Sequence, residues 1–218
     1  MQYRNTLLSQ QAVDITPLNN GSFLWSKAKN IDDFENDYSF KKVSVRGIFD
    51  HNKEIQVEKI RNGEKGVDVI TPLYTHLNDK GEECGILVNR GWVPLDFKDL
   101  KMHYTSSVSG EVQGVLYRGD ATTKYSVANE PTIERYHTVN PYDISLIAQM
   151  RNLEESSKFM LLQVDVNPES RQILPTAPTA TELTTWYIKP ERHEAYAALW
   201  KYITFSGIFA NTALWLYF

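Results

Sequence analysis

The chain has 218 residues, of which 42% are hydrophobic and 23% charged, a composition that suits a globular domain with one buried core. Its formal net charge of −4 at pH 7 provides no electrostatic basis for binding nucleic acid. Cys84 is the only cysteine, which excludes an internal disulfide and a zinc site built from several cysteines.

The N-terminal part of the chain is predicted to be extended. Residues 1–8 are polar and mixed, without the apolar segment of a secretory signal or the Arg- and Ser-rich helix of an organelle presequence. Residues 10–36 are predicted to form a loop, because they contain Pro17, the turn-forming Asn19-Asn20-Gly21 and an acidic patch at Asp32–Asp37. We therefore assign residues 1–37 to an N-terminal extended segment.

Short strand signals separated by turns dominate the body of the chain. Lys41–Phe49 and Glu54–Ile60 have the alternation of half-buried strands, and Arg61-Asn62-Gly63 after them indicates a hairpin turn. Pro72 indicates an edge or a bulge in its strand, because proline has no N–H to donate. The predicted strands are Lys41–Phe49, Glu54–Ile60, Val67–Leu77, Gly85–Val93, Glu111–Tyr117, Phe159–Val166 and Leu183–Ile188. The pattern predicts an α+β, mainly β domain over residues 38–190, built as an antiparallel β-barrel or sandwich.

One amphipathic helix is predicted between these strands. Asn140 is a favourable N-cap, Pro141 suits the first helical position, and Asp143 places negative charge in the first turn. The residues expected on its apolar face are Leu146, Ile147, Met150 and Leu153.

The C-terminal residues 191–218 are predicted to form a transmembrane helix. Tyr202–Phe218 carries no formal charge, and Lys201 lies near one end, where its long side chain can reach lipid headgroups. Aromatic residues stand at both ends, as in the aromatic belts of membrane helices. The small and polar residues that suit helix packing are Gly207, Ala210, Ala213, Ser206, Asn211 and Thr212. The alternative is a buried or docking helix of a soluble protein, because Asn211 and Thr212 lower the hydropathy.

Two residues of the Asn-Arg-Gly-Trp segment have predicted structural roles. Arg90 is expected to fix a corner of the sheet through a buried or edge ion pair, with a partner-binding role as the alternative. Gly91 is expected to allow a bulge or a close backbone approach beside Trp92.

Several segments, in order, resemble the surfeit locus protein 1 family of cytochrome c oxidase assembly factors. The most specific is Ile-Leu-Val-Asn-Arg-Gly-Trp-Val-Pro at Ile86–Pro94. The other similar segments are Val45–His51 with Lys53-Glu54, Val69–Leu73, Gly110–Gly114, and Arg192–Tyr196 with Trp200. The resemblance covers residues 38–218, with weaker similarity at residues 3–8.

The resemblance implies an inner-membrane protein of mitochondria or bacteria that helps to build the haem a-containing oxidase. In this family the main domain lies between the membranes and is held by a helix at each end. The family's N-terminal transmembrane helix, with its Gly-x-Trp-Gln signature, is absent here. Lys189, Arg192 and Lys201 by themselves favour the matrix side for the domain, whereas the family implies the mitochondrial inner membrane with the domain facing the intermembrane space.

His193 is the candidate cofactor-binding residue. It matches the family histidine that bacterial relatives are thought to use for haem a, and imidazole is an ordinary axial ligand of haem iron. Tyr196 and Trp200 follow at three and seven residues, so all three share one helix face. The alternative is an interfacial histidine that bonds a headgroup, a carbonyl or the partner oxidase.

No catalytic or metal site is predicted. The sequence contains no His-Glu-x-x-His, no Gly-x-Ser-x-Gly and no phosphate-binding glycine loop, so we do not expect an enzyme. The remaining histidines are scattered and give no metal-binding spacing; they are His51, His76, His103 and His137.

Three functions remain open from the sequence. The first is a biogenesis factor of mitochondrial cytochrome c oxidase (complex IV) that assists haem a insertion into the catalytic subunit. The second is a permanent accessory subunit of the oxidase or of a respiratory supercomplex, and the third is a soluble β-barrel that binds a ligand. The partners expected for the first two are oxidase core subunits, other inner-membrane respiratory subunits and membrane lipid.

Overall fold

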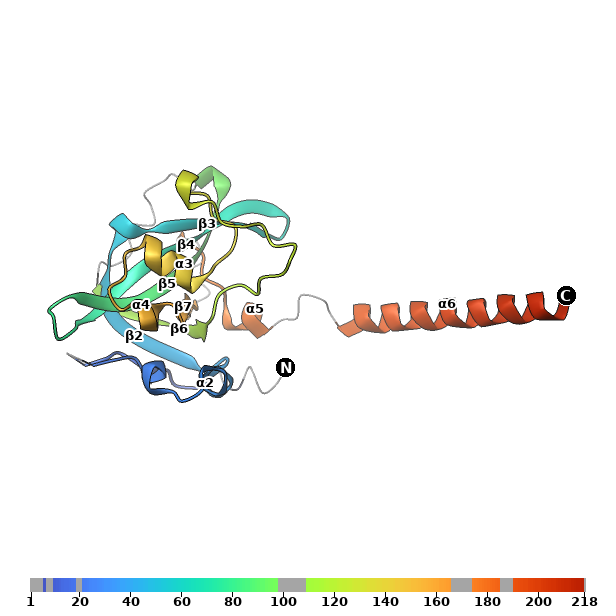
Figure 1. The fold of residues 1–218 in the computed structure, drawn as a ribbon, viewed down its shortest axis with the longest axis horizontal. Coiled ribbons are helices and arrows are strands. Elements are labelled where there is room, and N and C mark those ends of the chain that lie inside the picture. Colours follow the sequence, from blue (N-terminus) through green and yellow to red (C-terminus); the bar gives the residue numbers. More distant parts are fainter. Residues whose placement is uncertain are drawn as a thin grey trace. The chain divides into compact units, whose positions relative to one another are not determined.

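The computed structural model describes residues 6, 10–18, 21–97, 109–165, 174–184 and 190–217 (Figure 1). The chain divides into two compact units, Gln2–Ala180 and Thr181–Phe218. The first unit contains every strand among the described residues, and the second contains the long C-terminal helix α6 (Pro190–Tyr217).

Five strands close a small barrel in the first unit. β2 pairs with β6, β6 with β7, β7 with β5 and β5 with β4, and β4 pairs with β2 to complete the ring. Two further strands join its edges, since β1 lies parallel to β2 and β3 lies antiparallel to β4. The strands are β1 (Val13–Asp14), β2 (Lys42–Phe49), β3 (Ile55–Arg61), β4 (Glu64–Leu77), β5 (Glu83–Pro94), β6 (Ser109–Tyr117) and β7 (Met160–Gln163). The mainly β prediction is confirmed, as a barrel.

The barrel is mixed, whereas the sequence predicted an antiparallel one. β7 lies between β6 and β5, antiparallel to the first and parallel to the second. β6 and β7 are antiparallel neighbours, so the long segment between them returns the chain into the place between β6 and β5, where β7 is parallel to β5. A hairpin pattern in the sequence does not reveal this insertion of β7 between β5 and β6.

β2 and β3 behave as one strand bent at a corner. Both pair with the same side of β4: β3 pairs with β4 as far as Ile70, and β2 pairs with it at Leu73 and Tyr74. The turn η2 (His51–Lys53) forms the bend. Pro72 lies where β4 changes its partner from β3 to β2, so neither of these two strands requires an N–H from it. The Pro72 carbonyl accepts a hydrogen bond from the Asp50 N–H at 3.0 Å.

The pairing of β4 with β5 is irregular on both sides of Pro72, where the sequence predicted an edge or a bulge. The register of β4 against β5 shifts between Val69 and Ile70 and again between Tyr74 and His76. The predicted hairpin turn is also confirmed, because Asn62 and Gly63 both have positive φ (52° and 85°) between β3 and β4.

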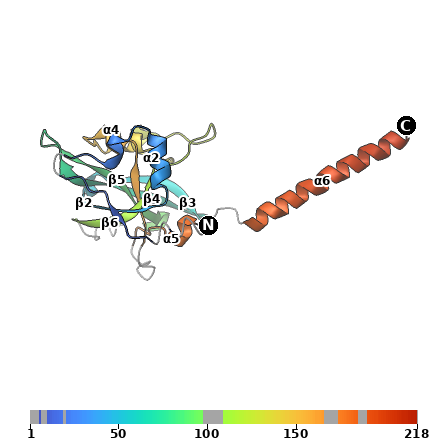
Figure 2. The same ribbon diagram turned by 90° about the horizontal axis from the view of Figure 1, so that it is seen from below.

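The N-terminal segment is not simply a loop, so that prediction is wrong for part of its length. It forms β1, the turn η1 (Leu24–Lys27) and the helix α2 (Ile31–Tyr38), which contacts β6 (Figure 2). The Asn30 side chain caps α2 by accepting the Asp32 N–H at 3.0 Å. Phe34 and Tyr38 turn one face of α2 to the core. The many acidic residues on the other face obscured this short amphipathic pattern.

Two aromatic residues of this segment complete the barrel core. Phe23 and Trp25 are fully buried and stack with ring centroids 4.5 Å apart. The Trp25 ring also meets Phe159 edge-on at 5.5 Å, and its indole N–H donates to the Glu155 carbonyl at 3.0 Å. The segment is therefore part of the barrel's packing.

The predicted amphipathic helix is broken in two. α3 (Pro141–Ile147) ends before Gln149, which has a φ of 56°, and α4 (Leu153–Ser156) follows. The N-cap prediction is confirmed, since Asn140 accepts the Tyr142 N–H at 3.0 Å. The predicted face was partly wrong, because Leu146 is exposed while Ile144 is buried. Only the first part of the predicted helical segment forms one continuous helix. The side of that helix that is buried therefore differs from the predicted side.

The predicted strand Leu183–Ile188 is not observed at its start. Residues 180–184 form the helix α5 (Ala180–Thr184), and residues 185–189 lie outside the described residues. The Thr, Trp and Tyr residues here favoured a strand, whereas Ala180, Glu182 and Leu183 are good helix formers. The remaining short turns are η3 (Leu95–Phe97) and η5 (Pro131–Ile133).

α6 is a helix as predicted, but the expected membrane crossing is not supported. Within the described residues, no helix combines the length and the apolar character that a membrane crossing requires. α6 is long enough at 28 residues. Its hydropathy is lowered by Lys201, by Asn211 and by the many Tyr, Thr and Ser residues along it.

Trp25 provides a test of the aromatic core. Trp25→Ala should lower the free energy of unfolding by about 3–5 kcal/mol, because it removes a fully buried ring that the surrounding barrel cannot replace. Urea unfolding followed by circular dichroism measures this change. Leu18→Ala is the matched control, since Leu18 in the same segment is 85% exposed. Equal midpoints for the two variants would contradict a structural role of the N-terminal segment.

Candidate functional site

The signature Asn89-Arg90-Gly91-Trp92 lies at the end of β5, in the barrel wall. Val69 of β4 pairs with Gly91 and Ile70 pairs with Asn89, so Arg90 is the extra residue of a β-bulge. The bulge is followed by Gly91, whose φ is 129°. A Cβ atom at Gly91 would lie 2.4 Å from the Thr176 carbonyl oxygen, so only glycine fits. The predicted bulge and the predicted close backbone approach are both present.

Arg90 forms the buried ion pair that the sequence predicted. Its Nη1 lies 3.6 Å from Glu54 Oε2, and the two side chains are only 3% and 4% exposed. Glu54 stands between η2 and β3, at the corner where β2 bends into β3. Arg90 therefore joins β5 to this corner past the intervening strand β4.

Other groups complete the surroundings of this ion pair. The Thr71 hydroxyl donates to Glu54 Oε2 at 3.4 Å, and Arg90 Nη1 lies 3.4 Å from His51 Nδ1. The Arg90 guanidinium also lies over the Phe49 ring, 5.2 Å from its centroid. The His51 side chain is mostly covered, since only 14% of it is exposed.

The environment of Glu54 changes its protonation. Burial raises the pKa of the Glu54 carboxyl from 4.5 to about 7, while the Arg90 charge and the Thr71 hydrogen bond oppose the rise. The corner therefore takes up or releases a proton near neutral pH. Its ion pair is complete only when Glu54 has lost that proton.

A second polar group lies on the opposite face of β5. Asn89 donates to Asp68 Oδ2 at 3.2 Å and to the Tyr117 hydroxyl at 3.4 Å, and Arg61 Nη2 lies 3.1 Å from Asp68 Oδ1. Burial raises the pKa of Asp68, with Arg61 opposing the rise. Since Asn89 and Arg90 are both occupied inside the domain, the signature is explained by the construction of the barrel.

A polar cleft of about 530 Å³ lies beside the corner, between the start of β3 and the end of α3. Two of its lining residues, Glu134 and Gln149, have φ values of 55° and 56°. Backbone strain of this kind is tolerated when the surroundings hold it in place. The cleft is the feature that a ligand-binding barrel would use.

His193 lies in the first turns of α6, and its side chain is outside the described part of the structure. Tyr196 and Trp200 follow on the same helix and are 54% and 66% exposed. The three positions lie in one continuous helix, and their shared face stays a prediction from the spacing.

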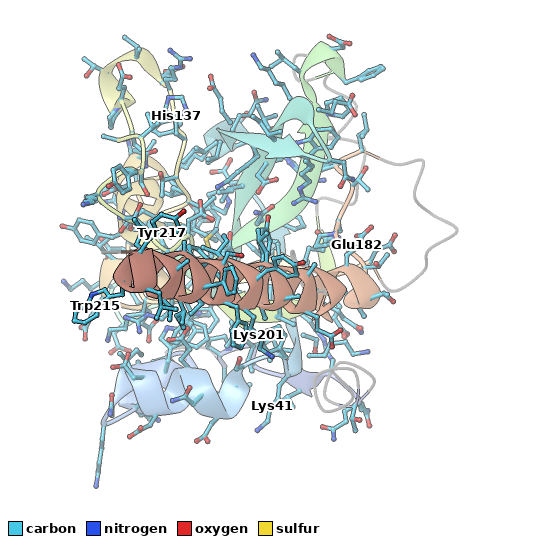
Figure 3. The ribbon with its side chains drawn as sticks, turned by 90° about the vertical axis from the view of Figure 1, so that its right-hand side faces the viewer. Lys41, His137, Glu182, Lys201, Trp215 and Tyr217 are labelled. Atoms are coloured by element: carbon cyan, nitrogen blue, oxygen red, sulfur yellow. The ribbon has the colours of Figure 1, made fainter. Side chains whose placement is uncertain are left out.

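The surface of α6 is apolar on all sides and exposed. Lys201, Trp215 and Tyr217, labelled in Figure 3, all come from this helix. Its exposed large side chains include Phe205, Ile208, Phe209 and Leu216. A helix with apolar residues all round is typical of one that other structure covers, because water-exposed apolar area of this extent is unfavourable.

The remaining histidines form no shared site. His76 Nδ1 forms a hydrogen bond of 2.8 Å with the Thr75 hydroxyl, and His137 Nδ1 lies 3.3 Å from Glu58 Oε2. His103 lies outside the described residues. Among the residues that the structure describes, no group of His, Cys, Asp and Glu side chains is arranged to hold a metal ion.

Comparison with known proteins agrees with the strand signatures. The sequence model of the SURF1 family matches residues 2–205. Surfeit locus protein 1 of Xenopus tropicalis is 30% identical over 133 residues, which is 53% of this chain and 41% of that protein. Surfeit locus protein 1 of Arabidopsis thaliana is 33% identical over 102 residues, or 44% of this chain and 27% of that protein. A surfeit locus protein 1-like protein of the same plant is 41% identical over 66 residues, or 28% and 17%.

The fold and the buried signature define a small, mainly β barrel domain followed by an apolar helix. The family match covers this barrel and most of α6, and the chain therefore belongs to the SURF1 family. The segments that match the curated relatives span less than half the length of those proteins.

Glu54 provides a test of the buried corner. The carboxyl titrates near 4.5 when unfolded and near 7 when folded, so the folded chain holds its proton over this interval. The wild-type free energy of unfolding should therefore fall, through this group, as pH rises from about 4.5 to about 7. Glu54→Gln cannot titrate. Its stability relative to wild type should rise over the same interval by on the order of 3 kcal/mol.

Urea unfolding at several pH values across this interval measures the difference. Glu111→Gln is the matched control for the loss of one carboxyl group, because Glu111 lies on the barrel surface. A wild-type protein that becomes more stable than Glu54→Gln as pH rises would contradict the inferred pKa.

Proposed function

We propose that this protein acts in the biogenesis of mitochondrial cytochrome c oxidase. The observation that carries the proposal is the SURF1 family match over residues 2–205, which includes the barrel and most of α6. The surfeit locus family assists assembly of the haem a-containing oxidase, so the same task is the simplest one for this chain. The proposed place is the mitochondrial inner membrane, with the barrel facing the intermembrane space.

The physical construction suits a protein that binds and does not catalyse. Arg90 of the signature is buried and paired with Glu54, and Asp68 beside the signature is paired with Arg61, so the barrel is a rigid support. The exposed apolar side chains are on α6. A rigid domain that carries one apolar helix fits recognition of another protein, here the oxidase core subunits.

His193 fits the proposed haem a contact. In support, His193 precedes Tyr196 and Trp200 by three and seven residues within α6, and the exposed rings of these two residues give an apolar surface against which a porphyrin can lie. When bound, haem a would supply the redox centre of the oxidase, and this chain would only hold it. His193 would contribute the imidazole and the two aromatic residues the apolar contact.

The His193 contact can be tested on the purified full-length chain. After incubation with haem a and gel filtration, His193→Ala should retain about tenfold less haem than wild type, because the axial nitrogen is lost. The absorbance of the eluted protein measures retention. His137→Ala, on the barrel, is the matched control and should retain haem as wild type does. Equal retention by all three proteins would end the haem proposal.

A second candidate function is a permanent accessory subunit of the oxidase or of a respiratory supercomplex. The exposed surface of α6 favours this function, because an apolar helix surface of this length is unfavourable in water unless other structure stays bound to it. The two functions use the same partner and differ in how long the complex persists.

Removal of the protein from its source cells distinguishes these functions. As a biogenesis factor, its loss should lower the amount of assembled oxidase, while purified active oxidase contains only traces of it. As a subunit, it should be present at one copy per oxidase. Native gels and quantitative mass spectrometry measure both quantities. Normal oxidase in cells that lack the protein, together with no co-purification, would contradict both functions.

A further inference from the structure

The hairpin turn between β3 and β4 consists of the dipeptide Asn62-Gly63. Its two residues have φ values of 52° and 85°, and both are exposed. The side-chain amide of asparagine is one of the thermally labile groups of proteins. When the next residue is glycine, no side chain shields the following backbone nitrogen from the amide carbon. The turn therefore brings together the two groups that react when an asparagine loses its amide.

The surroundings of Gly63 leave its backbone nitrogen accessible. A Cβ atom placed on Gly63 would meet no other atom within 4 Å. Among the residues that the structure describes, no oxygen accepts a hydrogen bond from the Gly63 N–H. The tip of the hairpin can therefore rotate to bring the Gly63 nitrogen to Cγ of Asn62 without breaking a contact outside the turn.

The sequence contains a second Asn-Gly pair, Asn20-Gly21, and there the glycine is held differently. The Gly21 N–H donates to the Leu18 carbonyl at 2.7 Å, and a Cβ atom on Gly21 would lie 2.6 Å from the same carbonyl oxygen. The Gly21 nitrogen is therefore both hydrogen-bonded and crowded. The two pairs have the same covalent chemistry, so any difference in their reactivity comes from the fold.

Asn78 shows how the fold holds an asparagine in another hairpin turn. Its Oδ1 accepts the N–H groups of Lys80 and Glu82 at 3.0 and 2.9 Å, and its Nδ2 donates to the Glu82 carboxylate at 2.9 Å. Both ends of this amide are fixed, and the next residue is Asp79. Asn62 combines exposure with a following glycine, which Asn78 does not.

We propose that Asn62 is a site of spontaneous covalent modification in the folded protein, with water as the co-reactant. The Gly63 nitrogen attacks Cγ of Asn62 and forms a C–N bond, the Cγ–Nδ2 bond breaks, and the Gly63 amide proton leaves with the side-chain nitrogen as ammonia. Water then opens the cyclic imide at one of its two carbonyl carbons. Opening at Cγ gives aspartate, whereas opening at the backbone carbonyl carbon gives isoaspartate, in which the chain continues through Cγ. This chemistry is independent of the proposed function.

The isoaspartyl product alters the contacts of Arg61. It adds one atom to the backbone of the turn, so the two-residue loop no longer pairs Arg61 with Glu64 in the present register. Arg61 Nη2 lies 3.1 Å from Asp68 Oδ1, and Asp68 also accepts a hydrogen bond from Asn89 of the signature. A modification at the exposed hairpin tip therefore affects the buried polar group beside β5.

The test uses the purified full-length chain in mildly alkaline heavy-oxygen water, either folded or unfolded in urea. Each reaction adds one heavy oxygen atom, which mass spectrometry of the digested protein locates. In the folded chain, Asn20 should be labelled about tenfold more slowly than Asn62, because the Gly21 hydrogen bond must first break. In urea the two sites should be labelled at similar rates. Equal rates at both sites in the folded chain, or no labelling of Asn62 there, would overturn the inference.

Two variants separate the reaction from its structural effect. Gly63→Ala should slow labelling of Asn62 about tenfold, because the added methyl group shields the nitrogen. Asn62→Asp carries the added charge without the extra backbone atom. The isoaspartyl protein, isolated by chromatography, should therefore unfold at a lower urea concentration than Asn62→Asp. Unchanged labelling in Gly63→Ala would contradict attack by the Gly63 nitrogen, and equal midpoints for the other two proteins would contradict the loss of strand pairing.

Discussion

The ion pair between Arg90 and Glu54 is the contact on which the barrel's geometry depends. β4 must pair on one side with β3 and then with β2, and this is achieved only if the chain between those strands bends at residues 50–54. Arg90, held inward by its bulge, contacts the corner from the far strand of the β4–β5 pair. Buried ion pairs contribute little net stability, because desolvation offsets their attraction, but an unpaired buried charge is costly. The pair therefore selects one corner geometry over its alternatives.

Local strand chemistry made much of the barrel predictable. Alternating residues located β2 and β3, the Asn62-Gly63 turn located the hairpin, and the Asn-Arg-Gly-Trp segment indicated both a bulge and an ion pair. The predictions that were wrong concern features that depend on residues far apart in the sequence. The parallel pairing of β7 with β5 depends on the insertion of β7 between two strands that come earlier in the chain, and the burial of Phe23 and Trp25 depends on a cavity that forms only when the barrel closes. No local pattern reports either feature.

The candidate site on α6 was visible in the sequence only in part. The shared face of His193, Tyr196 and Trp200 is a prediction from helical spacing, and α6 runs continuously through the three positions. The uncharged run Tyr202–Phe218 predicted a membrane span because aromatic residues stand at both of its ends. No helix of the described residues combines the length and the apolar character that such a span requires. A segment without charge can still have low hydropathy, because residues such as Asn211 and Thr212 are polar without being charged.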